Sequence, residues 1–406
     1  MDATPPGLSV FGATRKIPFW LPLLLGFLQA VGPISIDMYL PAFPAIEHDF
    51  HAATGSAQLT LATWVLGLSL GQMVHGALSD RFGRRLPLVA GTALYTLGAM
   101  GCALSGSIAQ LAFWRFVAAL GGSASMIAPR AIVRDVAHGV DATKLMSRLI
   151  LILGAAPILA PSLGGFVLIY ANWRWIFWIT AGYGALGTIL AAAFLPDTLV
   201  ISRRVPLDMG ALLIRWKGIL TERVFLTHAL MLSFSSFALF AYLGGTPVVF
   251  IQHFGLTPGQ FAIVFGSVAA AYVLCSQLNI FVIHRLGIGG VLRLASTLYL
   301  LVTVVLVGFA FADWGGAVAL GVVLAMAQGL IGFLAPAATV GALTKHAAHA
   351  GSASALLGTM QFLIGCSAGF VIGPLMSMFG GSAVPMALLM AGGALAIKIA
   401  DRARPG

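Results

Sequence analysis

The sequence predicts an all-α membrane protein that crosses the bilayer twelve times. Only 8% of its 406 residues are charged and 59% are hydrophobic, whereas about a quarter of a soluble globular chain is charged. Its apolar stretches reach the roughly 20 residues that a membrane-spanning helix needs. The alternating segments of about ten residues that mark a membrane β-barrel are absent. A mean hydropathy of +0.99 agrees with this class and excludes disordered and coiled-coil proteins.

Cutting the chain at charged and Pro/Gly-rich stretches gives the individual spans. The first follows Arg15 and Lys16 and so resembles a signal peptide. Its apolar stretch continues to Ile46, well beyond a signal core of roughly 7–15 residues, which indicates a retained helix. The predicted spans are 17–42, 57–78, 86–106, 109–132, 147–170, 173–195, 222–250, 258–283, 291–312, 315–340, 352–378 and 382–400.

The basic residues predict the orientation of these spans. All but two of the 22 Lys and Arg residues fall in even-numbered connections, at the span ends beside them, or at the termini, the exceptions being Arg115 and Arg174. Because Lys and Arg collect on the cytoplasmic side, both termini are expected there. The net charge of +10 therefore reflects membrane topology. Binding to nucleic acid is not expected, since the basic residues form no continuous stripe.

The connection 196–221 is the longest and most polar, and it divides the chain into halves of six spans. We expect an N-terminal bundle at 1–195, a cytoplasmic linker at 196–221 and a C-terminal bundle at 222–406. A weak internal repeat agrees, because RFG at 81–83 is echoed by RLG at 285–287. Repeated bundles are typical of transporters, although chance can also produce such a match in a chain with 49 glycines.

The most specific motif is the string GALSDRFGRR, which runs from Gly76 to Arg85 between spans 2 and 3. Gly83 permits a tight turn, and Asp80 can accept hydrogen bonds from a helix N-terminus. The alternative is an ordinary basic loop on the cytoplasmic side. Three arginines can pair with carboxylates or lipid phosphates: Arg81, Arg84 and Arg85.

A second charged pair follows span 4. Asp135, beside Arg134, is expected to pair with Arg81 or Arg84 unless it is simply a solvated loop charge.

One acid and one base lie deep inside predicted spans. Asp37 is the only acid well inside one, where a charged Asp costs about 2.5–3.5 kcal/mol at a helix centre. An acid that holds and releases a proton there suits proton coupling, although Asp37 could instead be a polar cap near the outer interface. Arg115 stays charged and needs water, a carboxylate or helix carbonyls. It is either a coupling residue or a strut between helices, and direct pairing with Asp37 remains open.

These motifs carry a family resemblance. GALSDRFGRR resembles the signature loop of the major facilitator superfamily. Five further motifs narrow the resemblance to the Bcr/CflA drug:proton antiporters. They are DMYLPA at 37–42, RFVAALG at 115–121, PRAIVRD at 129–135, APILAPSLGG at 156–165 and NWRWIF at 172–177. The C-terminal half matches mainly in hydropathy. One departure is Ala118, which stands where the family usually has Gln.

The resemblance implies the major facilitator fold, with two pseudo-symmetric six-helix bundles. It also makes span 5 the antiporter motif, which packs against the opposite half and limits leakage. The plain alternative is a kinked, close-packed helix. The residues of this motif are Pro157, Pro161, Gly164 and Gly165.

Other signals are weaker. Four aromatic residues could line a cavity for lipophilic compounds, or could serve in packing alone: Tyr39, Phe237, Phe240 and Phe362. GLSLG at 67–71 matches the nucleophile elbow formally, but it lies in mid-helix, so no enzyme is expected. The three cysteines fall in apolar runs and indicate packing, not metal binding. Without an ATP site, we expect no cofactor and a proton gradient as the energy source.

The function implied by the resemblance is proton-coupled efflux of small lipophilic or amphipathic antibiotics of the chloramphenicol or bicyclomycin type. A monomer in the bacterial inner membrane would move them by alternating access, with substrate bound between the bundles. Direction, coupling and substrate class all come from the resemblance. One rival is a proton-coupled exporter of a metabolite, such as an amino-acid derivative, nucleoside or sugar. Another is a membrane enzyme or sensor, which the lack of a catalytic cluster disfavours.

Overall fold

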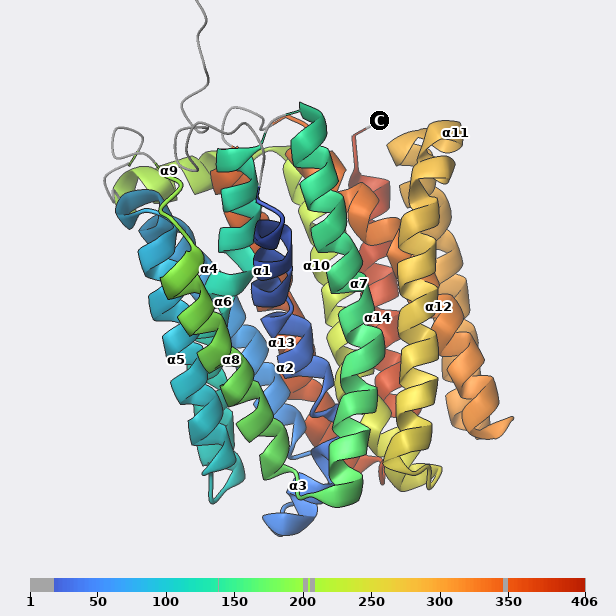
Figure 1. Cartoon of the computed structure of the whole chain (residues 1–406). Helices are drawn as coiled ribbons and strands as arrows, with labels where there is room; N and C mark the ends of the chain where they lie inside the picture. Colours follow the sequence, from blue (N-terminus) through green and yellow to red (C-terminus); the bar gives the residue numbers. More distant parts are fainter. Residues whose placement is uncertain (1–17, 138, 200–203, 205–208, 346–349, 406) are drawn as a thin grey trace, which may run out of the picture.

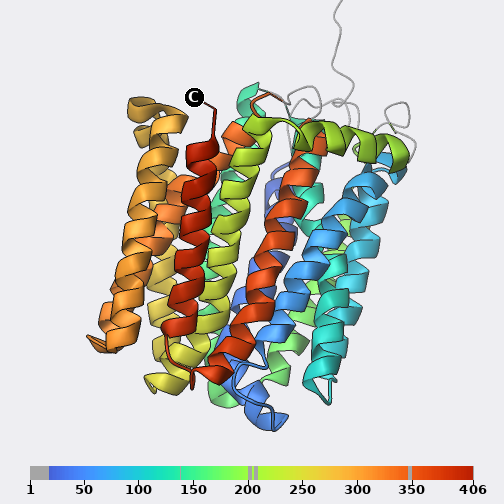
Figure 2. The same ribbon diagram turned by 180° about the vertical axis from the view of Figure 1, so that it is seen from behind.

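The computed structural model describes residues 18–137, 139–199, 204, 209–345 and 350–405. Within these helices the side chains at 134, 139–144, 146–148, 150–153, 209, 211–215 and 350–352 are outside the description. The described chain contains helices and no strand. Its long helices run between two ends: the α9 end, where α9 and the C-terminus lie, and the opposite α3 end (Figures 1 and 2).

The helices follow the order of the predicted spans. Each long helix is rich in apolar residues, which suits the hydrocarbon of a bilayer. Its backbone N–H and C=O groups bond to each other within the helix, as a bilayer requires. The elements are α1 (Trp20–Gln29), α2 (Val31–Asp37), η2 (Leu40–Ala42), α3 (Phe43–Asp49), α4 (Gln58–Phe82), α5 (Arg85–Ala103), α6 (Ile108–Val136), α7 (Gly139–Tyr170), α8 (Arg174–Phe194), α9 (Met209–Leu220), α10 (Arg223–Pro247), η4 (Val248–His253), α11 (Pro258–Ala312), α12 (Gly316–Leu343), α13 (Ala350–Met378) and α14 (Val384–Ala403).

The predicted twelve crossings are confirmed. Ten helical segments among the described residues are long and apolar enough to span a membrane. One of them, α11, has 55 residues and is broken at Gly287, where φ is 69°, so it covers two predicted spans. Gly154–Tyr170, the apolar part of α7, supplies the remaining crossing.

Two predicted segments differ in detail. The first span is not one helix but the series α1, α2, η2 and α3. Pro33 and Pro41 lie within it, and proline lacks the N–H that continues a helical ladder. The linker was expected as a polar connection, yet it contains α9, which lies across the end that carries the C-terminus (Figures 1 and 2).

The two halves of the chain contact each other along two helix pairs. Within the first half α6 packs on α4 and α5, and within the second α10 packs on α13 and α14. Across the halves, α4 packs on α13 and α7 on α11. The α4–α13 contact is close because Gly369 lies against Ala62, and a Cβ there would be 2.9 Å from the alanine Cβ. Small residues allow such approach between membrane helices.

Candidate functional site

Asp37 is buried where the two halves of the chain meet. It is the last residue of α2, at the helix break, and is 6% exposed. The carbonyl of the next residue, Met38, lies directly against Gly164 of α7. Tyr242 of α10 is close enough to interact electrostatically with Asp37. Within the described part of the chain, the Asp37 carboxylate has no ion pair or hydrogen bond.

Arg115 lies deeper in the first half, in a cage of aromatic rings. Its guanidinium carbon is 4.1 Å from the ring centroid of Tyr39 and 4.3 Å from that of Trp64. Phe177 is the third ring, at 5.8 Å. Such rings stabilise a cation through their negative faces. Because Arg115 is only 2% exposed, its guanidinium has lost its hydration. The contacts with the rings offset part of that loss.

Arg115 and Asp37 are therefore not a direct ion pair. Instead, Arg115 Nη1 donates a hydrogen bond to the carbonyl oxygen of Ser35, at 2.9 Å. Ser35 precedes Asp37 by two residues on the same helix, so Arg115 holds the end of α2 in position. Its Nε and Nη2 have no hydrogen-bond partner among the described residues. A buried N–H group without a partner costs free energy. A polar group that accepts a hydrogen bond from Nε or Nη2 would therefore be bound favourably.

The departure at Ala118 belongs to the contact between α5 and α6. Ala118 is buried, and a Cβ on Gly98 would lie only 2.5 Å from its backbone nitrogen. Two small residues thus bring the helices together, and the longer Gln of the family would need more room here.

The signature string forms a polar cluster at the α9 end, centred on Arg84. Gly83 ends α4 with φ 91° and ψ 174°, a conformation that is essentially confined to glycine. Arg84 Nη1 donates to Asp80 Oδ1 at 2.6 Å and to Ser79 Oγ at 3.0 Å. Arg84 Nε donates to Asp135 Oδ2 at 2.8 Å. Burial opposes the charge of Arg84, but the two carboxylates outweigh it and raise its pKa above the usual value.

One member of this cluster was not among the predicted site residues. Asp197, just after α8, accepts the backbone N–H of Arg84 at 2.9 Å and a guanidinium N–H of Arg204 at 2.7 Å. The carboxylate at the N-terminus of α5 is thus Asp197, where Asp80 was expected. A negative charge is favourable at that helix end. The signal in the sequence was the dipeptide Pro196-Asp197 directly after a span.

The other predicted members of the string have different contacts. Arg81 lies over the ring of Phe82, with 5.2 Å from its guanidinium carbon to the centroid. Arg85 donates to the carbonyl oxygen of Ala192. A Cβ on Gly76 would meet no atom within 4 Å. The side chain of Arg134 lies outside the described residues.

The predicted motif on α7 lies where the first half, to which α7 belongs, meets the second. Gly164 faces Met38 of the first half, while a Cβ on Gly165 would be 3.2 Å from the carbonyl oxygen of Pro258 in α11. Pro157 and Pro161 both lie inside the helix. Because glycine at these positions permits backbone contact on both sides, α7 closes the junction where Asp37 is buried.

The four predicted aromatic residues do not form one cluster. Phe240 and Phe362 meet across α10 and α13, with ring centroids 6.3 Å apart. Phe237 packs against Phe234 instead. Tyr39 belongs to the cage around Arg115.

Glu47 is a buried acid outside the predicted spans and was not among the predicted site residues. It is 4% exposed and lies on α3. Glu47 Oε1 accepts the backbone N–H groups of Gly55 and Ala57, at 2.8 and 3.1 Å. Glu47 Oε2 accepts a hydrogen bond from Gln252 Nε2 at 3.1 Å. Since Gln252 lies on η4 in the second half, Glu47 joins the halves at the α3 end.

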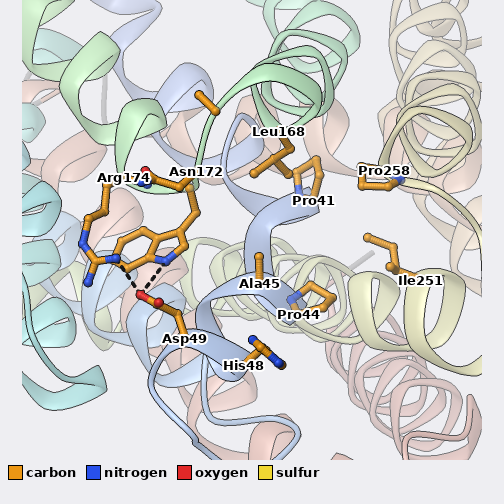
Figure 3. Close-up of a pocket in the computed structure, with 12 residues that line it drawn as sticks. Pro41, Pro44, Ala45, His48, Asp49, Leu168, Asn172, Arg174, Ile251 and Pro258 are labelled. Carbon is orange, nitrogen blue, oxygen red and sulfur yellow. Dashed lines mark hydrogen bonds and ion pairs between the residues drawn. The ribbon is translucent and has the colours of Figure 1, made fainter.

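A cavity of about 440 Å³ opens beside this bridge. Figure 3 shows Pro41, Pro44 and Ala45 on one side and Ile251 and Pro258 on the other. The cavity is thus bounded by both halves of the chain.

The comparisons with known proteins agree with this architecture. The sequence model described as Major Facilitator Superfamily matches residues 25–370. The chain belongs to this superfamily. It is therefore a transporter of small molecules and not an enzyme, and its multi-pass fold and bacterial relatives imply the plasma membrane.

Several members of the superfamily are similar over most of the chain. An uncharacterized MFS-type transporter, YdgK of Bacillus subtilis, is 35% identical and covers 93% of both chains. A bicyclomycin resistance protein homolog of Haemophilus influenzae is 28% identical, over 93% of this chain and 94% of the relative. A chloramphenicol resistance protein of Pseudomonas aeruginosa is 29% identical, over 86% and 81%. The predicted resemblance to drug antiporters of this kind is confirmed.

Solved structures show the same fold. The crystal structure of a D-xylose-proton symporter superposes with a TM-score of 0.74, at 15% identity, and covers 95% of this chain and 97% of the symporter.

Proposed function

We propose that the protein is a proton-coupled exporter that expels small lipophilic or amphipathic antibiotics, of the chloramphenicol or bicyclomycin type, across the bacterial inner membrane. The drug class is supported by the names of the relatives in Haemophilus influenzae and Pseudomonas aeruginosa. The proton coupling is supported by one observation above all: Asp37 is buried where both halves meet and has no ion pair among the described residues.

The chemistry follows from that environment. An ionised carboxylate in an apolar site is costly unless a partner compensates it. A proton or a polar group of the substrate can supply that compensation in turn, which makes their binding competitive. Arg115 of α6 holds the end of α2 through Ser35. A change at Asp37 is therefore transmitted to α6. No cofactor is required, because the proton gradient supplies the energy.

Movement of the halves completes the cycle. The segments 1–195 and 222–406 would rock against each other as two bundles. The protein would work as a monomer, with both termini cytoplasmic. On this orientation the Arg84 cluster lies at the cytoplasmic end and the Glu47–Gln252 bridge at the outer end. Reporter fusions at Gly406 and near Arg204 test it, since both must report a cytoplasmic location.

The decisive experiment compares wild type with Asp37→Asn in proteoliposomes carrying a proton gradient. The Asn variant should fold and bind neutral compounds but lose uphill export, and Asp37→Glu should recover part of it. Asp313→Asn, which changes an exposed acid, is the matched control. Substrate-induced proton release from purified protein gives a second readout. If Asp37→Asn releases protons as wild type does, another group carries them.

A substrate panel separates drug export from the rival metabolite export. Antibiotics of the two named types form one arm, and amino-acid derivatives, nucleosides and sugars form the other. Export confined to the second arm would contradict the proposed drug class.

A further inference from the structure

The cavity at the α3 end is bounded by segments that are far apart in the sequence. Pro41 and Ala45 come from the broken first span, Leu168 from α7, Ile251 from η4 and Pro258 from the start of α11 (Figure 3). Its volume of about 440 Å³ lies within the 300–1,000 Å³ of typical small-molecule sites. Since both halves form its walls, any movement between the halves changes its shape.

Two contacts fix these walls against each other. Glu47 Oε2 accepts the hydrogen bond from Gln252, the neighbour of Ile251. Gly165 lies against the carbonyl of Pro258. The proline side chains add rigidity, because proline has a fixed φ. The cavity is therefore preformed, which lowers the entropic cost of binding.

The polar side of the cavity is electrically balanced. Asp49 Oδ2 accepts hydrogen bonds from Arg174 Nη1 at 2.5 Å and from Trp173 Nε1 at 3.1 Å. The Asn172 side-chain oxygen accepts the backbone N–H of Arg174. Figure 3 shows Asp49 joined to Arg174 on this side, with His48 nearby. The carboxylate and the guanidinium thus neutralise each other.

This balance selects the chemistry of a ligand. Asp49 and Arg174 pair with each other, so among the described residues of the lining a charged compound would give up water without meeting an unpaired carboxylate or guanidinium, which is unfavourable. An uncharged compound can place an apolar part against the prolines and Leu168 and direct hydroxyl or amide groups toward His48 and Asn172. A few polar groups in a mainly apolar wall are the usual composition of a small-molecule site.

We propose that this cavity is a second binding site for the exported compound, occupied on its way out, and that it accepts uncharged amphipathic molecules. The transport role rests on the proposed function. Pro41 follows Asp37 by four residues, and α7 contacts both the Asp37 segment and the cavity wall, so the two sites share their supporting elements.

Cysteine protection tests the site directly. Ala45 lines the cavity and is exposed, whereas Ala53 is exposed at the same end but outside the lining. In Ala45→Cys and Ala53→Cys, labelling by a membrane-impermeant maleimide is measured with and without chloramphenicol. Chloramphenicol should slow labelling at position 45 at least threefold and leave position 53 unchanged. Equal rates at position 45 with and without the compound overturn the proposal.

The ligand class is tested with a charged analogue. Chloramphenicol succinate, an anion, should protect position 45 at least tenfold less well than chloramphenicol at equal concentration. Equal protection by the two compounds overturns the requirement for an uncharged ligand.

A filled cavity tests the transport role. Ala45→Trp should lower chloramphenicol export at least fivefold relative to the matched Ala53→Trp, with both variants inserted in equal amounts. Export without protection at position 45 overturns the site and leaves the proposed function standing. Protection without proton-driven export overturns the proposed function and confines the cavity to binding.

Discussion

The bridge between Glu47 and Gln252 predicts how firmly the two halves are held together at the α3 end. The substitution Gln252→Ala removes the hydrogen bond to Glu47 Oε2, at 3.1 Å, and leaves the bonds from Gly55 and Ala57 to Oε1 intact. The Glu47 side chain thus stays bonded to the backbone just before α4. The change therefore acts on the contact across the halves and not on the local fold.

The magnitude follows from the charge and exposure of the partners. A hydrogen bond to a charged group contributes about 1.5–3 kcal/mol. The Gln252 side chain is exposed while Glu47 is buried, so water can partly replace the lost donor and the lower limit applies. About 1.5 kcal/mol corresponds to roughly a tenfold shift in an equilibrium constant. We expect the open state at the α3 end to gain about tenfold in population relative to the closed one.

Spin-label distances measure this shift. Ala53 and Ala312 are exposed at the α3 end on different halves, so cysteines at these positions report the separation of the halves. The native cysteines are replaced by serine in every sample. Gln252→Ala should increase the long-distance population, most clearly when the protein is detergent-purified without substrate.

The matched control is Gln260→Ala, because among the described residues the hydrogen bonds of Gln260 are local capping contacts with Thr257 at the start of α11. It should leave the distances unchanged. If Gln252→Ala gives the same distance distribution as wild type and Gln260→Ala, the bridge does not restrain the halves and the reasoning is refuted.

Three further predictions concern the rest of the site. Gly83→Ala places a Cβ on the Asp197 carboxylate in a backbone conformation that costs about 1–3 kcal/mol; we expect slower turnover with near-normal substrate affinity, and normal turnover would contradict it. Arg115→Lys keeps the charge but loses the planar guanidinium that lies over Tyr39; transport should fall strongly, whereas full activity in Arg115→Ala would exclude a coupling role. Gly164→Val overlaps the Met38 carbonyl and should separate α7 from α2; proteoliposomes should then leak protons without substrate, and a tight membrane would argue against this sealing role.

The sequence by itself determined the class, the number of crossings and the position of the signature turn. These are local properties, because each span must bury about 20 apolar residues of its own, and a positive φ favours glycine wherever the chain turns in that way. The repeat also has a local counterpart, since Gly83 and Gly287 both have positive φ, at 91° and 69°. Their positions deep inside apolar spans identified Asp37 and Arg115, and the signature string identified Arg84.

Only the tertiary structure decided how these residues are partnered. The backbone N–H of Arg84 donates a hydrogen bond to Asp197, which is 113 residues away in the chain. Gln252 donates one to Glu47 across 205 residues. Hydropathy specifies that a helix is buried but not which neighbour its polar groups meet. The cavity beside Ile251 depends on the same packing. A hydrogen bond requires atoms within about 3 Å, and such distances are set by how α3, η4, α7 and α11 pack together, which no span predicts alone.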